Sequence, residues 1–321
     1  FCTIEPNVGM ISVPDPRLNK LVEMCNPKSV VPATVEIVDI AGLVKGASRG
    51  EGLGNKFLAN IRETDAILHV LRCFDDENVT HVDGSVDPVR DMEVINYELM
   101  AKDLETIDSR LAKTEKAAKA GADKTARMQL GVLNVLKEAL EQGRPARSVE
   151  IEGIEERKFL HDLFLLTDKP VLYVCNVDDA SAVSGNKYVD RVKEAAKAEN
   201  AGVMIVSART ESEIAELDTA EERAEFLSEM GLTESGADRL IRAAYNLLDL
   251  QTYFTAGPDE CRAWTFVRGT KAPKAAGIIH TDFEKGFIRA EVIKYDDFVT
   301  LGSESAVRDA GKLGVEGKEY V

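Results

Sequence analysis

The sequence predicts an α/β fold with a mostly parallel sheet, an inserted helical coiled-coil hairpin and a small C-terminal α+β module. Short apolar runs alternate with helical stretches in residues 1–92 and again in 165–248. This alternation is typical of a parallel sheet covered on both faces. Residues 93–164 carry almost no strand signal, and residues 249–321 are rich in glycine and β-branched residues. We therefore expect a discontinuous α/β domain, a hairpin and a third module with these boundaries.

Four runs are expected to form the strands of the α/β domain. They cover residues 35–39, 66–73, 170–176 and 202–207, and most of their side chains are apolar. A helical stretch over 188–199 separates the last two runs. Strands that alternate with helices indicate βαβ units and a parallel sheet.

The central region is expected to be a helical hairpin. Its apolar residues recur at alternating steps of three and four, and after a break at 121–123 the pattern resumes. The positions are Tyr97, Met100, Leu104, Ile107 and Leu111, followed by Leu133, Leu136 and Leu140. This spacing predicts a coiled-coil seam. Residues 110–147 hold nine Lys/Arg and four Asp/Glu, a local charge of +5, which suits either a solvated helix face or a docking surface for an anionic partner such as RNA.

The C-terminal region is expected to be rich in strands. Residues 263–267, 276–280 and 287–292 are mostly apolar or β-branched, and glycines lie among them. The pattern predicts a small α+β module.

Composition excludes several classes of protein. The chain has 321 residues, of which 44 % are hydrophobic and 30 % charged, so a folded core is expected. It has no apolar run of about 18 residues that would cross a membrane, and no signal peptide at its start. The net charge of −16 opposes coating of nucleic acid by the whole surface. Five scattered cysteines favour a reducing compartment, and we expect a cytoplasmic protein.

The first candidate site follows the run 35–39. Asp39 ends this run and Gly42 comes three residues later. A carboxylate at a strand end suits Mg²⁺, and glycine lets the backbone N–H approach a terminal phosphate. Four glycines in residues 46–54 suggest a nucleotide-sensing loop. Upstream, the hydroxyl of Thr3 is a candidate second magnesium ligand, although an ordinary strand or turn threonine is the plainer interpretation.

The second candidate site lies at the ends of two later strands. Asn176 ends the run 170–176 and Asp179 follows it, while Ser207 ends the run 202–207 and Ala208 follows it. Ligands bind at the carboxyl ends of strands in open α/β sheets, and amide and carboxylate groups suit the edge of a purine. The sequence therefore predicts a base-binding pocket here.

Together these motifs resemble the YchF family, the Obg-like ATPases within the translation-factor GTPases. Residues 1–9 are similar to the first switch of that family, and residues 39–66 are similar to its second switch. Residues 251–257 and 263–265 resemble the entry to its TGS domain, and 280–291 resemble the TGS signature.

The resemblance implies a P-loop NTPase-like domain over 1–92 and 165–248, the hairpin over 93–164 and a β-grasp-like TGS domain over 249–321. It also implies Mg²⁺-dependent hydrolysis of ATP in preference to GTP. The implied partner is the ribosome, with the large subunit as the expected contact, and RNA is a further partner for the hairpin and the TGS domain.

Several residues carry over from the resemblance. Thr3 and Asp39 match the magnesium positions, and Asp39 with Gly42 matches the γ-phosphate motif. Val177 stands where GTP-specific members of the wider class have Lys, which fits loss of guanine specificity. Asp179 stands where the family usually has Glu, a departure from the family's pattern that leaves the strength of the ATP preference open.

The residue that orients the attacking water is expected to differ from that of many GTPases. Leu43 follows Gly42 at a position where those enzymes place glutamine, and leucine has no hydrogen-bonding group. Among four histidines, His81 is the candidate catalytic residue because it follows a strand by a short polar loop. An ordinary loop histidine is the alternative interpretation.

The phosphate-binding pattern Gly-x-x-x-x-Gly-Lys-Ser/Thr does not occur in the 321 residues. From this, from a first residue that is Phe, and from a last TGS strand expected after Val321, we expect a chain that is truncated at both ends. We expect these 321 residues to be inactive by themselves and the full-length protein to be an ATPase. The alternative is a ribosome- or RNA-binding adaptor in which hydrolysis is incidental or absent. A GTPase is a third possibility, and Val177 disfavours it.

Overall fold

The computed structural model describes residues 7–40, 53–81, 84–120 and 124–321. It separates into two compact units, one built mainly from Val38–Leu240 and the other from Gly9–Ile37 and Ile241–Val321. This division differs from the sequence-based boundaries, which assign residues 9–37 to the nucleotide-binding domain. Those domain limits stay a prediction.

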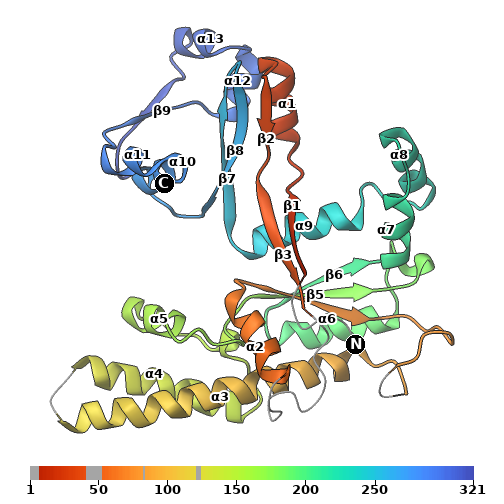
Figure 1. Cartoon of the computed structure of the whole chain (residues 1–321), viewed down its shortest axis with the longest axis vertical. Helices are drawn as coiled ribbons and strands as arrows, with labels where there is room; N and C mark the ends of the chain where they lie inside the picture. Colours follow the sequence, from red (N-terminus) through yellow and green to blue (C-terminus); the bar gives the residue numbers. More distant parts are fainter. Residues whose placement is uncertain (1–6, 41–52, 82–83, 121–123) are drawn as a thin grey trace. The chain divides into compact units, whose positions relative to one another are not determined.

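The first unit contains a three-stranded parallel sheet in the order β4-β5-β6 (Figure 1). The strands are β4 (Ile67–Arg72), β5 (Val171–Asn176) and β6 (Gly202–Val206). Five consecutive side chains of β5 are buried, as expected for a central strand of a parallel sheet. Three of the four predicted strands and their parallel pairing are confirmed. The fourth predicted run, residues 35–39, does form a strand, β3 (Thr34–Asp39), but that strand pairs with β1 (Asn7–Ser12) in a separate two-stranded sheet.

Helices cover this sheet. Helix α6 (Lys187–Lys197) buries Val189 and Val192 against Tyr173 and Cys175 of β5. Met92 of helix α3 (Pro88–Ala120) joins the same cluster. A second cluster contains two residues of helix α2 (Leu53–Glu63), Leu58 and Ile61, with Leu99 and Leu166.

The predicted hairpin is confirmed. Helices α3 and α4 (Lys124–Glu141) run side by side, with the short helices η2 (Ala146–Ser148) and α5 (Ile154–His161) after them (Figure 1). Most predicted seam residues join one buried cluster, namely Met100, Ile107, Leu111, Leu133, Leu136 and Leu140, with Leu104 packed against it. Tyr97 does not, because its side chain is 61 % exposed. The prediction for Tyr97 is wrong, since the early turns of α3 face the sheet through Met92 and Asn96 instead.

Two buried polar networks connect the hairpin to the rest of the first unit. The Asp103 carboxylate accepts hydrogen bonds from Leu166 N (2.8 Å), Thr167 N (2.7 Å) and Thr167 Oγ1 (2.7 Å). Burial raises the pKa of Asp103 despite these three donors. Arg147 pairs with Glu199 (2.5 Å), and Glu199 also accepts from the hydroxyl of Tyr173 (3.0 Å). These contacts position the base of the hairpin against β5 and the end of α6.

The first unit also contains the short helix η3 (Asp179–Ser181), α7 (Ala208–Ala215) and α8 (Ala220–Glu229). Helix α9 (Gly236–Leu247) begins in the first unit and belongs to the second unit from Ile241 on. Helix α8 begins at a capping box, in which Thr219 Oγ1 accepts from Glu222 N and the Glu222 carboxylate accepts from Thr219 N. None of the described helices is both long and apolar enough to cross a membrane.

The second unit is built around a three-stranded sheet. Strand β8 (Glu260–Val267) lies between β2 (Ser29–Val31), which is parallel to it, and β7 (Leu250–Ala256), which is antiparallel. Strands β1 (Asn7–Ser12) and β3 (Thr34–Asp39) form a two-stranded sheet. Helix α1 (Pro16–Cys25) packs Leu18 and Leu21 into the core.

The C-terminal module is more helical than predicted. Residues 276–280 belong mainly to helix α10 (Ala272–Ile279), so the predicted strand is wrong. Pro273 in the first turn and the neighbouring alanines favour helix over strand. Of the strand predicted over 287–292, only β9 (Ala290–Val292) forms, and it pairs with β10 (Gly314–Glu316). Helices α11 (Thr281–Lys285), α12 (Tyr295–Leu301) and α13 (Glu304–Asp309) complete the module.

Candidate functional site

The predicted base-binding residues lie at the carboxyl ends of β5 and β6. These two strands are adjacent and parallel, so the loops that follow them start at the same edge of the sheet. Val177 N donates to Val206 O (2.9 Å), which continues the ladder into the loops. The side chain of Val177 is buried, and it packs in the sheet core.

Asn176 and Ala208 are brought together. The Oδ1 atom of Asn176 accepts a hydrogen bond from Ala208 N at 3.0 Å. Ala208 is the first residue of α7, where backbone N–H groups have no partner within the helix. This bond fixes the plane of the Asn176 amide across the two loops.

Asp179 joins the same loops through two hydroxyl groups. Its Oδ1 atom accepts from Ser207 Oγ and from Thr210 Oγ1, both at 2.7 Å. Ser207 also caps α7, because its Oγ accepts from Thr210 N at 3.2 Å. Both donors are buried, and the hydrogen bonds from Ser207 and Thr210 lower the pKa of Asp179. The carboxylate is therefore ionised and fixed in direction at neutral pH.

The second oxygen of Asp179 lies at the surface side of this cluster. The side chain is 35 % exposed, and its Oδ2 atom lies 3.7 Å from Nε of Arg209, which is itself exposed. An ionised carboxylate only accepts hydrogen bonds, whereas an asparagine amide both donates and accepts. The pair formed by Asn176 and Asp179 has the chemistry needed to bind the polar edge of a purine.

Asp39 is the last residue of β3, and its side chain is exposed. A carboxylate offers the hard oxygen donors that Mg²⁺ prefers, so Asp39 fits the predicted metal role. Thr3, Gly42 and Leu43 lie outside the described residues. Among the residues that the structure describes, no group of three His, Cys, Asp or Glu side chains is placed to hold a metal ion.

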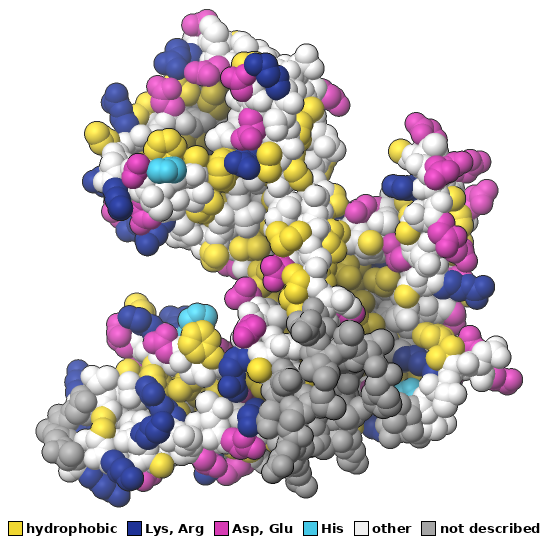
Figure 2. All heavy atoms as spheres, in the orientation of Figure 1, with side chains coloured by type: hydrophobic (Ala, Val, Ile, Leu, Met, Phe, Trp, Pro, Cys, Tyr) yellow, Lys and Arg dark blue, Asp and Glu magenta, His cyan; other side chains and the backbone are white. Residues whose placement is uncertain are grey.

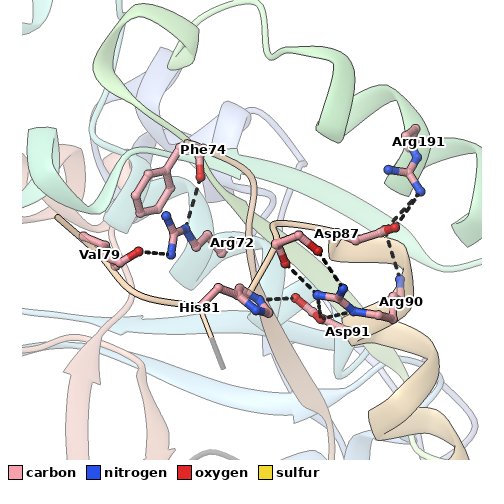
Figure 3. A network of polar contacts seen from close by, with 9 residues as sticks. Arg72, Phe74, Val79, His81, Asp87, Arg90, Asp91 and Arg191 are labelled. Carbon is pink, nitrogen blue, oxygen red and sulfur yellow. Dashed lines mark hydrogen bonds and ion pairs between the residues drawn. The ribbon is translucent and has the colours of Figure 1, made fainter. Parts of the chain in front are cut away.

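His81 lies in the segment between β4 and α3 and contacts an acidic residue of α3. Its Nε2 atom is 2.9 Å from Oδ2 of Asp91 (Figure 3). The side chain of His81 is 16 % exposed and that of Asp91 is 24 % exposed, so both are mostly buried. Asp91 was not among the predicted site residues. The sequence signal that could have found it is an acidic residue in the first turn of a helix that follows a polar loop. Thr210 was also missed, although it comes just after Ser207.

Basic side chains lie along the hairpin (Figure 2). Some of them are engaged within the chain, since Lys137 pairs with Asp108 (2.6 Å) and Arg110 lies over the ring of Phe159 (5.7 Å to its centroid). Lys113 and Lys116 are exposed. The exposed lysines are the part of the +5 segment that is best placed to meet an anionic partner.

Two family models match the sequence. The model described as "50S ribosome-binding GTPase" matches residues 1–102. The model of the YchF C-terminal domain, described as "Protein of unknown function (DUF933)", matches residues 250–321.

Curated proteins and a solved structure are similar to the whole chain. The "Ribosome-binding ATPase YchF" of Bacillus subtilis is 55 % identical over 323 residues, which cover all of this chain and 87 % of that protein. "Obg-like ATPase 1" of Homo sapiens is 44 % identical, with all of this chain and 82 % of that protein covered. The "Structure of the Schizosaccharomyces pombe YchF GTPase" has a TM-score of 0.88 at 39 % identity, with 100 % and 86 % of the two chains covered. The sequence identity and the shared fold, each over the whole length, establish that the chain belongs to the YchF family.

Proposed function

We propose that the protein is a Mg²⁺-dependent ATPase that associates with ribosomes and acts as a nucleotide-dependent switch. The observation that carries this proposal is the pair of loops after β5 and β6, which orient Asn176 and Asp179 at one edge of a parallel sheet. The printed names of the relatives, ribosome-binding ATPase and Obg-like ATPase, support the same activity.

The base is proposed to bind against Asn176, Asp179, Ser207 and Ala208. Val177 replaces the lysine expected in GTP-specific members of the wider class, and its side chain points into the core. We therefore propose that ATP is preferred to GTP. Asp179 stands in place of the usual glutamate, so the strength of this preference is to be measured by competition between ATP and GTP.

The phosphates and the metal are proposed to bind near the end of β3. Asp39 would hold Mg²⁺ together with Thr3, and the backbone at Gly42 would approach the γ-phosphate. When bound, Mg²⁺ supplies positive charge that stabilises the transferring phosphoryl group. His81 is proposed to orient the attacking water, because Leu43 has no group that forms a hydrogen bond.

The hairpin and the C-terminal module, which resembles a TGS domain, are proposed to contact the ribosome, with the large subunit and its RNA as the binding surface. A cytoplasmic location follows from this partner. The exposed lysines of the hairpin also favour a second candidate function, an adaptor that binds ribosomal RNA and in which hydrolysis is incidental.

Ribosome co-sedimentation separates the two candidates. The native gene product is used, because the 321 residues contain no Gly-x-x-x-x-Gly-Lys-Ser/Thr pattern. A switch is expected to bind ribosomes differently with ATP, with ADP and without nucleotide. An adaptor is expected to bind equally in all three states, with a steep dependence on salt. Equal binding would contradict the switch.

A further inference from the structure

The segment of residues 73–81, which follows β4 and ends at His81, is held from the β4 side by Arg72. The guanidinium donates to the carbonyl oxygens of Phe74 (3.1 Å), Asp76 (3.2 Å) and Val79 (2.8 Å), and it lies 4.8 Å from the centroid of the Phe74 ring. One side chain thus binds three carbonyl groups of the segment, and Figure 3 shows the contacts to Phe74 and Val79. Carbonyl groups satisfied in this way fix the path of the backbone.

The same segment is fastened to α6 at two further points. Nδ2 of Asn186 donates to Cys73 O at 2.7 Å, and the hydroxyl of Tyr188 donates to the Asp75 carboxylate at 2.8 Å. The position of the segment is therefore set by side chains on both sides of it, and His81 is not carried on a long unattached loop.

Asp91 is itself held in place. Its Oδ1 atom accepts from Nε (3.2 Å) and Nη2 (3.1 Å) of Arg90, while its Oδ2 atom faces Nε2 of His81. Arg90 also donates to Ser85 O at 2.8 Å. One carboxylate oxygen of Asp91 therefore contacts Arg90, and the other contacts His81 (Figure 3).

We propose that Asp91 is a positioning residue, which fixes the orientation and the tautomer of His81. This inference rests on the proposed catalytic role of His81. A carboxylate accepts hydrogen bonds, so Nε2 of His81 carries a hydrogen, and in the neutral ring Nδ1 is then the proton acceptor. The neutral imidazole would thus meet the attacking water as one defined tautomer.

The substitution Asp91→Asn tests this because it keeps the shape of the side chain and reverses one hydrogen bond. Arg90 has only donors, so the amide oxygen of asparagine must face it. The amide NH₂ group then faces His81 and donates to Nε2, which moves the ring proton to Nδ1. The contact is preserved while the tautomer is inverted.

Two measurements on the native gene product follow. In ¹⁵N-histidine NMR, the ring nitrogens of His81, assigned by the loss of one signal set in His81→Ala, are expected to show Nε2–H in the native protein and Nδ1–H in Asp91→Asn. In steady-state ATP hydrolysis, His81→Ala is expected to lower kcat by about 100-fold. Asp91→Asn is expected to lower kcat by at least about tenfold with KM within about twofold, and the double variant is expected to be no slower than His81→Ala.

Asp108→Asn is the matched control. Asp108 lies on the same helix and forms a comparable ion pair with Lys137, and its loss should leave both kcat and the His81 spectrum unchanged. If His81→Ala lowers kcat while Asp91→Asn alters neither kcat nor the tautomer, the positioning role is wrong and the proposed function stands. Additive losses in the double variant would also overturn the positioning role. If His81→Ala leaves kcat unchanged, the proposed catalytic role of His81 fails first.

Discussion

The bond between Asp179 and Thr210 allows a quantitative test of how the two base-binding loops are held together. Thr210→Val keeps the volume of the side chain and removes only the hydroxyl that donates to Asp179 at 2.7 Å. A hydrogen bond to a charged group contributes about 1.5–3 kcal/mol. Because the Asp179 side chain is 35 % exposed, water offsets part of the loss, and we expect about 1.5 kcal/mol.

Hydrogen exchange at the amide of Val177 measures this loss locally. That amide bonds to Val206 O between the two loops. Its opening free energy is expected to fall by about 1.5 kcal/mol in Thr210→Val and by about 2 kcal/mol in Asp179→Ala, which loses both hydroxyl contacts. The double variant is expected to lose about 2 kcal/mol, because the two changes remove one shared bond.

Thr114→Val serves as the control. Thr114 is also a buried threonine, and its Oγ1 donates to the carbonyl of Arg110 within the hairpin. It should leave exchange at Val177 unchanged. Two results would contradict a stabilising bond between Thr210 and Asp179. One is a change below about 0.5 kcal/mol in the opening free energy at Val177 in Thr210→Val, and the other is strict additivity in the double variant.

Because the pKa of Asp179 is lowered, the stability of the two base-binding loops is expected to depend on pH. The folded pKa lies below the ordinary value of 3.8, so the ionised form stabilises the folded state above that value. The difference in opening free energy between the native protein and Asp179→Asn is expected to be constant down to about pH 5. It should shrink as the pH falls through the lowered pKa. If the difference in opening free energy grew as the pH fell, the ionised form of Asp179 would not be the one that stabilises the folded state.

Three further predictions concern the hairpin. Asp103→Ala leaves three buried donors without their acceptor and is expected to lower the free energy of unfolding by about 3 kcal/mol, measured by urea denaturation. Arg147→Met leaves the Glu199 carboxylate buried without its cation and is expected to cost about 3–5 kcal/mol in the same assay, whereas Arg147→Met combined with Glu199→Gln should recover part of that loss. Lys113→Glu with Lys116→Glu should weaken ribosome binding and flatten its salt dependence, measured by co-sedimentation between low and high salt.

The sheet and the hairpin were predictable from the sequence because each has a periodicity that burial imposes. The strand β5 is buried on both faces, so its side chains are apolar without alternation. The hairpin seam has steps of three and four because two helices pack along it. Tyr97 fits the spacing but not the seam, since spacing cannot tell which neighbour a helical turn will meet.

Helix α10 could not be recognised from hydrophobicity. Residues 276–279 are all small or apolar, and such a short run fits either a helix or a strand. Pro273 and the alanines around it were the signal that decides for a helix.

The candidate site was predictable at the level of strand ends and less so at the level of contacts. Asn176 and Ser207 were placed correctly at the ends of two strands, because parallel strands bring their carboxyl ends to one edge. Ser207 and Asp179, which form a hydrogen bond, are 28 positions apart in the sequence, and His81 and Asp91 are ten positions apart. Those contacts depend on how the loops fold back, and no local pattern specifies this. The base-binding roles of Asn176, Val177, Asp179, Ser207 and Ala208, like the roles of Thr3, Asp39, Gly42 and His81, stay predictions.

A competition between ATP and GTP for the native gene product tests directly whether the loops after β5 and β6 bind the base of ATP. A fluorescent ATP analogue is bound with Mg²⁺ present, and each nucleotide is titrated against it, in the native protein and in Asp179→Ala. ATP is expected to displace the analogue at a lower concentration than GTP. Asp179→Ala is expected to weaken the binding of both nucleotides and to reduce the difference between them. Tighter binding of GTP, or unchanged binding in Asp179→Ala, would contradict the proposed base-binding site.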